Sequence, residues 1–543
     1  MKENQWWRGA VIYQIYPRSM KDSNGDGIGD LPGIVEKLDY IADLGVDAIW
    51  ISPFFKSPMK DFGYDISDYR AVDPLFGSLS DFDELIAKAH DLGLKVIIDQ
   101  VLSHTSDQHQ WFKESRENNG NSKADWYVWA DAQEDGTPPN NWLSIFGGSA
   151  WQWDPRRKQY YLHNFLVSQP DLNFHNEEVR QATLDNIEFW LKRGVDGFRL
   201  DAINFCYHDA SLTNNPAKPP ELRQGRGFSE DNPYAFQYHY HNNTQPENLA
   251  FIESIRELLN RYPNSVALGE ISSEDSLATM AEYTSGDSRL HMGYSFELLT
   301  DDFSAAYIRQ TVETLEQKMT EGWPCWAISN HDVKRVVSRW AADENCDNKA
   351  KILTALLCSL RGSVCSYQGE ELGLPEADLE FDQLHDPYGK TFWPTYKGRD
   401  GCRTPMPWIS DQLNCGFSES APWLPIPEEH AKKSVANQLD DQGSVLNSFK
   451  KFIAWRKTMP ALVGGDIEFI DMPEPVIGFI RRSQEQQIIL FFNLSNIRQI
   501  VGYDASLKIE KLEGHGIASG YLKSYELKLP SYGCFIGLVE TEE

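Results

Sequence analysis

The stretch GFRLDAINF, residues 197–205, decides the fold of this chain. It starts as a short apolar strand and contains two charged residues, Arg199 and Asp201, two positions apart. Alternate side chains of a strand point to the same face, so this arginine and this aspartate would lie side by side. A structural salt bridge is the simplest explanation for such a pair. A function for the pair depends on what the rest of the chain places beside it.

Similar short runs recur along the chain and alternate with segments of helical period. Eight of these runs are candidate strands: 11–15, 48–52, 95–99, 197–201, 266–270, 292–296, 325–329 and 364–368. A helix is predicted from Ser80 to Leu92, with Ser80 and Asp83 as its capping pattern and Gly93 at its end. Eight strands with helices between them predict an α/β fold, the (β/α)8 or TIM barrel.

Three segments do not fit a simple barrel unit. Two connections are long and poor in apolar periodicity, and the C-terminal part alternates apolar and polar residues as antiparallel strands do. The predicted division is a barrel of residues 1–103 and 171–464, an inserted subdomain after the third strand at 104–170, a lid-like insertion at about 206–245, and a C-terminal antiparallel β domain at 465–543.

Composition narrows the classes of partner. The 543 residues include 80 acidic and 51 basic side chains, a formal charge of −29 that would repel nucleic acid and anionic membranes alike. The N-terminal stretch MKENQWWRGAVIYQIYP lacks the apolar core of a signal peptide. The eight cysteines form no C-x-x-C pair, so we expect neither zinc nor a disulfide framework. We expect a cytoplasmic protein, a monomer or weak homo-oligomer, without a nucleic-acid or membrane partner.

Four carboxylates follow the ends of predicted strands, where barrel enzymes assemble their sites. They are Asp99, Asp201, Glu270 and Asp332. Each alone could cap a helix or pair with a cation. Four on one rim would raise the electrostatic energy and push their pKa values apart, which is tolerated mainly where chemistry needs an acid and a base. Glycoside hydrolysis needs such a pair.

The sequence around these carboxylates resembles the blocks of the α-amylase superfamily in order and spacing. The four blocks are DQVLSH (99–104), GFRLDAINF (197–205), LGEI (268–271) and SNHD (329–332). The match extends to GVDAIWISP (45–53), DFGYDISDY (61–69), QPDLN (169–173) and KGRDGCRTPMPW (397–408). The last two are similar to the α-glucosidase and oligo-1,6-glucosidase branch.

The resemblance implies a retaining glycosidase with Asp201 as nucleophile, Glu270 as general acid/base and Asp332 as a third carboxylate that binds sugar hydroxyls and stabilises the transition state. The physical chemistry of these positions agrees with those roles. Arg199 would hold the pKa of Asp201 down, and partial burial would raise the pKa of Glu270 so that it carries a proton at neutral pH.

The resemblance also implies a set of side chains around a terminal glucose. They are Asp61, Tyr64, His104, Phe146, Phe165, Arg199, His331 and Arg399. Asp61 and Arg399 would close the pocket behind the sugar, and the aromatic residues would pack against its ring. Phe146 lies in a Gly-rich insertion, where packing within the protein is an equal alternative.

Two positions depart from the superfamily pattern. Ser103 stands where an asparagine usually precedes the first histidine, which leaves open how that histidine is held. Asn204 and Phe205 stand where many α-amylases have Lys-His, a pair associated with long starch chains. The second departure argues against an endo-acting amylase.

The segment DSNGDGIGD, residues 22–30, begins like a calcium-binding loop. The family places one structural Ca²⁺ or Mg²⁺ there, held by Asp22, Asn24, Asp26, the Ile28 carbonyl and Asp30. Gly33 stands where an EF-hand has its glutamate, so this is no EF-hand, and an acidic Gly-rich turn is the alternative. We expect the metal, because carboxylates that converge on one loop would otherwise repel each other. No organic cofactor is expected.

The leading hypothesis is therefore an exo-acting retaining α-glucosidase. It would release nonreducing-end glucose from short α-glucosides, prefer α-1,4 bonds and transfer glucose to alcohols as well. Ala202, directly after the nucleophile, carries the linkage prediction, since the resembling enzymes tend to have valine there when isomaltose is the better substrate. The alternatives are an oligo-1,6-glucosidase, a sucrose isomerase or trehalose-forming enzyme, and a noncatalytic barrel that serves as a partner protein.

Overall fold

A computed structural model describes residues 5–223, 231–340, 346–503 and 507–540. In these ranges eight parallel strands form one sheet, in the order β11-β10-β9-β5-β2-β1-β13-β12. Their bounds are β1 Val11–Ile15, β2 Ala48–Ile51, β5 Lys95–Val101, β9 Gly197–Asp201, β10 Val266–Ile271, β11 Met292–Ser295, β12 Cys325–Trp326 and β13 Ser363–Tyr367. A parallel bridge between Gly293 and Pro324 brings β11 and β12 together, which makes the sheet a nearly closed barrel. The predicted fold class is confirmed.

The alternation of side chains along β9 explains the charged pair that opened the sequence. Phe198 and Leu200 pack outward, in the core that the barrel shares with the surrounding helices. Arg199 and Asp201 therefore point into the barrel. Other strands place apolar residues in the same interior, among them Ile12. The charged pair thus lies at the carboxyl end of the strands, above a barrel interior that is filled with apolar side chains.

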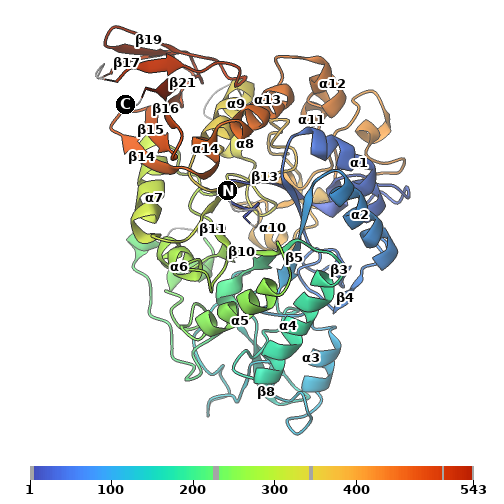
Figure 1. The fold of residues 1–543 in the computed structure, drawn as a ribbon. Coiled ribbons are helices and arrows are strands. Elements are labelled where there is room, and N and C mark those ends of the chain that lie inside the picture. The colour runs from blue at the N-terminus through green and yellow to red at the C-terminus, as the bar shows by residue number, and fades with distance from the viewer. Residues whose placement is uncertain (1–4, 224–230, 341–345, 504–506, 541–543) are drawn as a thin grey trace.

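Helices surround the barrel, as Figure 1 shows. The main ones are α1 Leu31–Asp43, α2 Leu79–Asp91, α4 Glu177–Leu191, α5 Asn248–Asn260, α6 Ser276–Tyr283, α7 Ala305–Lys318, α9 Cys346–Leu357 and α13 Val445–Lys457. The predicted cap of α2 was wrong by two residues. Ser78 is the N-cap and forms a reciprocal capping box with Asp81. Its extended backbone lets the hydroxyl reach the Asp81 amide, whereas Ser80 is already helical.

The inserted segment after β5 builds a small subdomain of its own. It contains α3 Gln110–Ser115 and the antiparallel sheet β6-β8-β7, with bounds Trp129–Ala130, Gln159–Leu162 and Trp151–Asp154. The stacked indoles of Trp142 and Trp151 lie in its apolar cluster. Of the predicted lid at 206–245, residues 224–230 lie outside the described residues. The remainder has short 3-10 turns and a bridge between Ala217 and Gln237.

The C-terminal part is antiparallel, and Figure 1 shows it at the opposite end of the molecule from α3 and β8. Its sheets are β14-β15-β16-β21-β18 and β17-β20-β19, formed by β14 Asp466–Ile470, β15 Val476–Arg482, β16 Gln487–Asn493, β17 Gln499–Gly502, β18 Ile509–Lys511, β19 Tyr521–Lys523, β20 Glu526–Leu529 and β21 Cys534–Val539. The fully buried Arg481 donates hydrogen bonds to the carbonyls of Ser359 and Leu360, which fastens this part to the barrel. None of the described helices is long and apolar enough to span a bilayer.

Candidate active site

A single buried guanidinium gathers three of the four strand-end carboxylates. Arg199 is fully buried, and its Nη1 lies 2.8 Å from Asp99 Oδ1 and 2.5 Å from Asp201 Oδ1. Its Nη2 forms an ion pair with Glu270 Oε1. The Tyr294 hydroxyl accepts a hydrogen bond from the same Nη2 at 2.8 Å and donates one to Glu270 at 3.0 Å. The strands β5, β9 and β10 thus present three carboxyls to one cation.

Three buried carboxyls that share one cation cannot all ionise without a large electrostatic free-energy cost. Burial raises the pKa of Asp201 to about 7 and that of Glu270 to about 7, while Arg199 pulls both values down. Burial likewise raises the pKa of Asp99 to about 6. The raised value for Glu270 agrees with the sequence prediction. Arg199 lowers the pKa of Asp201, as predicted from the sequence, but the net shift is upward because burial outweighs the single guanidinium that Asp201 shares with two other carboxyls.

Asp332 has the opposite electrostatic environment. Burial disfavours its charge, but His331, Arg399 and Arg403 outweigh burial and hold the pKa of Asp332 well below its usual range. Its Oδ1 lies 3.3 Å from Arg399 and 3.1 Å from Arg403. One carboxylate of the site is therefore ionised throughout the physiological pH range, while Asp201 and Glu270 both titrate near neutral pH.

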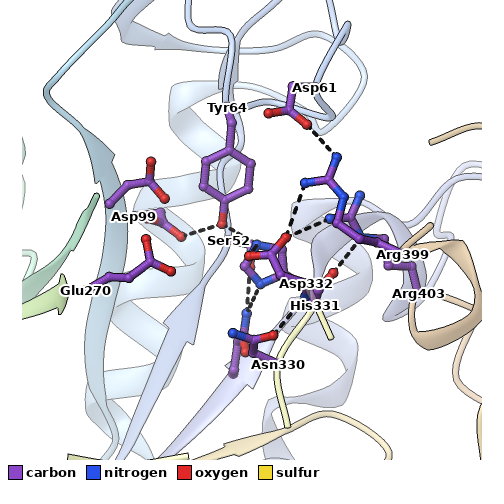
Figure 2. A network of polar contacts seen from close by, with 12 residues as sticks. Ser52, Asp61, Tyr64, Asp99, Glu270, Asn330, His331, Asp332, Arg399 and Arg403 are labelled. Atoms are coloured by element: carbon purple, nitrogen blue, oxygen red, sulfur yellow. Dashed lines mark hydrogen bonds and ion pairs between the residues drawn. The ribbon is translucent and has the colours of Figure 1, made fainter. Parts of the chain in front are cut away.

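His331 is uncharged, and its two ring nitrogens connect Tyr64 to Gln14 in the barrel interior by hydrogen bonds. The Gln14 amide donates to its Nδ1 at 2.7 Å, so Nε2 carries the hydrogen and lies 2.6 Å from the Tyr64 hydroxyl. Burial lowers the pKa of His331 to about 3. The Tyr64 hydroxyl in turn donates to Asp99 at 3.0 Å, a chain that Figure 2 shows.

An ion-pair network centred on Arg399 lies at one side of the site. Arg399 donates to Asp61 Oδ1 at 2.8 Å, and its Nε and Nη2 bind both oxygens of Asp386 at 3.0 and 2.8 Å. Gln169 donates to the other Asp61 oxygen at 3.1 Å. Figure 2 shows Asp61 and Arg399 on the side of Asp332 away from Glu270. Asp386 and Gln169 were not singled out from the sequence. Gln169 lies within the quoted QPDLN block, whereas nothing near Asp386 indicated a role.

These walls enclose one pocket at the carboxyl end of the barrel. Its lining residues are Asp61, Tyr64, His104, Ile145, Phe146, Phe165, Asp201, Ala202, Phe205, Glu270, Ser272, Phe296, Asp332, Tyr388 and Arg399. The structure thus brings nine of the eleven predicted catalytic and sugar-binding residues to one surface. Arg199 and His331 do not line it, because both are fully buried beneath Asp201 and Tyr64. Ile145, Ser272, Phe296 and Tyr388 were missed, because none of them lies in one of the quoted sequence blocks.

The first departure from the family pattern is accommodated locally. The Ser103 hydroxyl lies 3.0 Å from His104 Nδ1, and His104 Nε2 lies 3.1 Å from the Tyr64 carbonyl. The His104 ring is therefore held on both sides, and burial lowers its pKa to about 4.

Phe146, for which sugar binding and packing within the protein were equal alternatives, lines the pocket. Its ring also packs edge-on against the ring of Tyr388, with the two ring centroids 5.5 Å apart.

The second departure from the family pattern, Asn204 and Phe205, changes the rim of the barrel beside the pocket. Asn204 donates to the Ser272 carbonyl at 2.7 Å and to the Thr244 hydroxyl at 2.9 Å. It therefore joins the end of β9 to the end of β10 and to the lid-like insertion. Phe205 turns toward the pocket and packs against Phe165, with ring centroids 5.3 Å apart. An apolar surface stands where a long-chain amylase would present charged groups.

The acidic loop at 22–30 is held by its own side chains. Their oxygens accept from backbone amides further along the loop: Asp22 from Asn24, Gly25 and Gly27, Asn24 from Asp26, Asp26 from Ile28, and Asp30 from Gly33, where it caps α1. Throughout the described ranges, no three carboxylate, imidazole or thiol side chains converge into a metal-binding group. The predicted donors are all oxygens, which suits Ca²⁺ or Mg²⁺. A metal here would use their remaining lone pairs, and it stays a prediction.

Comparison with known proteins agrees with this geometry. The family model "Alpha amylase, catalytic domain" matches residues 14–465. The chain is 55% identical to a probable alpha-glucosidase of Rhizobium meliloti (98% of this chain, 97% of that one) and 37% identical to the oligo-1,6-glucosidase of Heyndrickxia coagulans (90% and 92%). The crystal structure of an alpha-glucosyl transfer enzyme superposes with a TM-score of 0.97 at 65% identity (98% and 99%). The chain therefore belongs to the alpha-amylase family of glycoside hydrolases and is a glucosidase-type enzyme.

Proposed function

We propose that the protein is an exo-acting, retaining α-glucosidase that removes nonreducing-end glucose from short α-glucosides. The observation that carries the proposal is the ion-pair network of Arg399 with Asp61 and Asp386, because in the resembling enzymes the pair at the positions of Asp61 and Arg399 closes the pocket behind the terminal glucose. A chain can enter such a pocket only by its end. A single terminal sugar is then held between the closed end and the carboxyls of Asp201 and Glu270.

The proposed reaction gives each of the three carboxyls its own role and charge state. Ionised Asp201 attacks the anomeric carbon while protonated Glu270 gives its proton to the leaving oxygen. Asp332, ionised at all working pH values, accepts hydrogen bonds from sugar hydroxyls and stabilises positive charge on the ring. Water or an alcohol then attacks the glucosyl ester and gives its proton to Glu270. Retaining enzymes hold their carboxyls about 5 to 5.5 Å apart, against about 6.5 to 9.5 Å for inverting ones, and one guanidinium that contacts both carboxyls supports the shorter spacing.

Asp61→Asn tests the closed end of the pocket. The amide keeps the shape but loses a charged partner of Arg399 and of the sugar, so we expect kcat/KM for maltose to fall about 10- to 100-fold, the effect of one charged hydrogen bond. Asp107→Asn is the matched control, because Asp107 pairs with Lys60 on the surface and should change nothing. An unchanged kcat/KM for Asp61→Asn, or a rapid fall in starch viscosity with the parent enzyme, would refute the exo assignment.

Ala202 carries the proposed preference for α-1,4 over α-1,6 bonds. It lines the pocket, and its amide donates to Glu270 Oε2 at 3.0 Å. We expect Ala202→Val to shift the kcat/KM ratio toward isomaltose by about tenfold, since a methylene-scale change in a pocket is worth about 10- to 200-fold. The backbone there has a φ of 41°, which a β-branched residue adopts only with strain, so Val should also lower Tm.

Ala202→Ser is the control for Ala202→Val. Serine is small and not β-branched, so the linkage preference should stay near that of the parent. Equal efficiency of the parent on maltose and isomaltose would make the inference from Ala202 wrong and would favour the oligo-1,6-glucosidase alternative.

We further propose that the loop at 22–30 binds one structural Ca²⁺ or Mg²⁺. The metal would bind the folded chain and not the unfolded one, so chelation by EDTA should lower Tm while the rate at moderate temperature stays within about twofold. Asp26→Asn should abolish this effect, because the exposed carboxylate of Asp26 is one of the predicted metal ligands of the loop. An unchanged melting curve together with a metal-free elemental analysis would remove the site.

A further inference from the structure

A hollow lies at the amino ends of the barrel strands, at the opposite end of the barrel from the carboxyls. Its wall includes residues that come just before four strands: Arg8 before β1, Ser265 before β10, His291 before β11 and Trp323 before β12. Its volume is about 270 Å³, and it shares no lining residue with the pocket of the carboxyls. We call it the amino-end hollow.

Arg8 brings a positive charge without an acidic partner to this hollow. Its guanidinium lies 4.6 Å from the ring centroid of Trp7 and 4.8 Å from that of Trp323. Arg361 contacts the same Trp323 ring but pairs with Glu316 at 2.9 Å. Among the described residues, none forms an ion pair or a hydrogen bond with the Arg8 side chain. Cation–π contacts use the face of a guanidinium, so its N–H groups are left for a ligand.

His291 adds a buried donor to the same hollow. It is 8% exposed, and its Nδ1 accepts a hydrogen bond from the Ala267 amide at 3.1 Å, so Nε2 carries the hydrogen. Within the described ranges, this N–H has no hydrogen-bond partner. Burial, together with the charges of Arg256 and Arg8, lowers the pKa of His291 to about 3. The ring is therefore a neutral donor beside two guanidinium groups.

Arg256 of α5 is the second cation of the wall. Its Nε donates to Asn260 Oδ1 at 3.0 Å and its Nη1 to the Arg289 carbonyl at 2.6 Å. Its Nη2 forms no hydrogen bond with any residue that the structure describes. Arg8, Arg256 and His291 thus have free N–H groups and no acceptor atom, which is complementary to an oxyanion.

Two acidic residues, Asp287 and Glu321, also line the amino-end hollow. Both are exposed, and neither forms an ion pair in the described part of the chain. Burial lowers the pKa of Arg8 and of Arg256, while Asp287 acts from beyond ion-pair distance to raise both values. The buried part of the wall therefore offers donors, and the exposed part offers carboxylate acceptors.

We propose that the amino-end hollow binds a hydroxylated monocarboxylate, such as a sugar acid, with its carboxylate on Arg8 and its hydroxyls toward Asp287 and Glu321. A guanidinium binds a carboxylate through two parallel hydrogen bonds. The two exposed acids would repel the second charge of phosphate but accept hydrogen bonds from hydroxyls. The volume is close to the lower limit of small-molecule pockets, about 300 Å³. Binding at this end of the barrel would stabilise the fold without a part in catalysis.

Gluconate is the probe, and sorbitol is its control because it has the same chain of hydroxyls without the carboxylate. Calorimetric titration of the parent at constant ionic strength should give one gluconate site, no sorbitol site and weaker binding of inorganic phosphate. Gluconate should also raise Tm, because it binds the folded chain and not the unfolded one.

Arg8→Met tests the contact that carries the proposal. Methionine keeps an apolar stem against the indoles but has no charge, so the Kd for gluconate should rise about 10- to 100-fold, the effect of charged hydrogen bonds. Arg8→Lys keeps the charge without the fork, so its Kd should lie between those of Arg8→Met and the parent. Arg156→Met is the matched control, because Arg156 is an exposed arginine of the inserted subdomain, and its Kd should equal that of the parent.

Maltose hydrolysis within about twofold of the parent in all three variants shows that they fold, since the active site lies at the other end of the barrel. The absence of gluconate binding to the parent overturns the inference, as do equal binding of sorbitol, tighter binding of phosphate and an unchanged Kd in Arg8→Met. Competitive inhibition of hydrolysis with a Ki equal to this Kd would place gluconate in the active site and also overturn it. Binding is measured directly, so the result does not depend on the proposed function.

Discussion

Asp201→Asn should leave a folded protein that has lost at least about four orders of magnitude in kcat, because the amide cannot form the glucosyl ester. Asp201 faces the pocket, and its Oδ1 lies 2.5 Å from the Arg199 guanidinium, which orients the carboxylate. The substitution keeps the size of the side chain, so the loss would measure covalent catalysis and not a cavity. Steady-state hydrolysis of maltose by protein free of the parent enzyme gives the value.

The same variant has a predicted effect on stability. Burial raises the pKa of Asp201 to about 7, above an unfolded value of about 4, so ionisation costs the folded state more than the unfolded one. This contribution is favourable below pH 4 and is lost as the pH rises through 7. We therefore expect Asp201→Asn to raise Tm, and to raise it more at pH 8 than at pH 5. Arg199 keeps Asp99 and Glu270 as partners, so no cation is left unpaired.

A second substitution separates loss of the nucleophile from general damage. Asp201→Gly opens space for a small anion, and azide added to the reaction should restore turnover. The product should be β-glucosyl azide, because the anomeric carbon is then inverted once and not twice. Activity within tenfold of the parent in Asp201→Asn, or an α-azide product from Asp201→Gly, would contradict the assigned role.

Glu270→Gln should lower kcat/KM for maltose about 10²- to 10⁴-fold, the usual contribution of general acid catalysis. The loss should depend on the leaving group. α-Glucosyl fluoride departs without a proton, so its first step should change by less than tenfold. Equal losses on maltose and on the fluoride would contradict the role of Glu270 as the proton donor.

The pH profile provides an independent test of the same role. Burial raises the pKa of Glu270 to about 7, so activity on maltose should fall above pH 7 as the acid deprotonates. Burial lowers the pKa of His331 to about 3 and that of His104 to about 4, so neither histidine titrates on that limb. The limb belongs to the coupled carboxyls, and it should be absent from the kcat/KM profile of the parent enzyme for α-glucosyl fluoride, because fluoride departs without a proton.

The sequence was most informative where local chemistry and strand geometry coincide. The alternation around Arg199 and Asp201 predicted that both point to one face, and apolar Phe198 and Leu200 face the helices as required. The carboxyls at the strand ends could be predicted because every strand of a barrel ends on the same rim. Resemblance to a family then supplied the roles that periodicity cannot give.

The rest of the site depends on contacts between distant segments. Asp386 meets Arg399 across thirteen positions of chain that include the short helix α10 Pro387–Phe392, and Gln14 of β1 contacts His331, which is 317 positions away in the sequence. Neither residue lies in a motif, so nothing local distinguishes them from surface polar residues. The pKa of Asp201 was also beyond sequence reasoning, because it depends on how many carboxyls share Arg199 and how deeply they are buried.

The anomeric configuration of freshly released glucose tests the central claim most directly. Hydrolysis of maltose is followed by ¹H NMR before mutarotation equilibrates the product, and the α- and β-anomeric signals are integrated from the first minutes. Retention through an ester on Asp201 predicts that α-glucose appears first and that the β-anomer grows in only with mutarotation. Initial release of β-glucose would contradict the two-step mechanism and the roles assigned to Asp201 and Glu270.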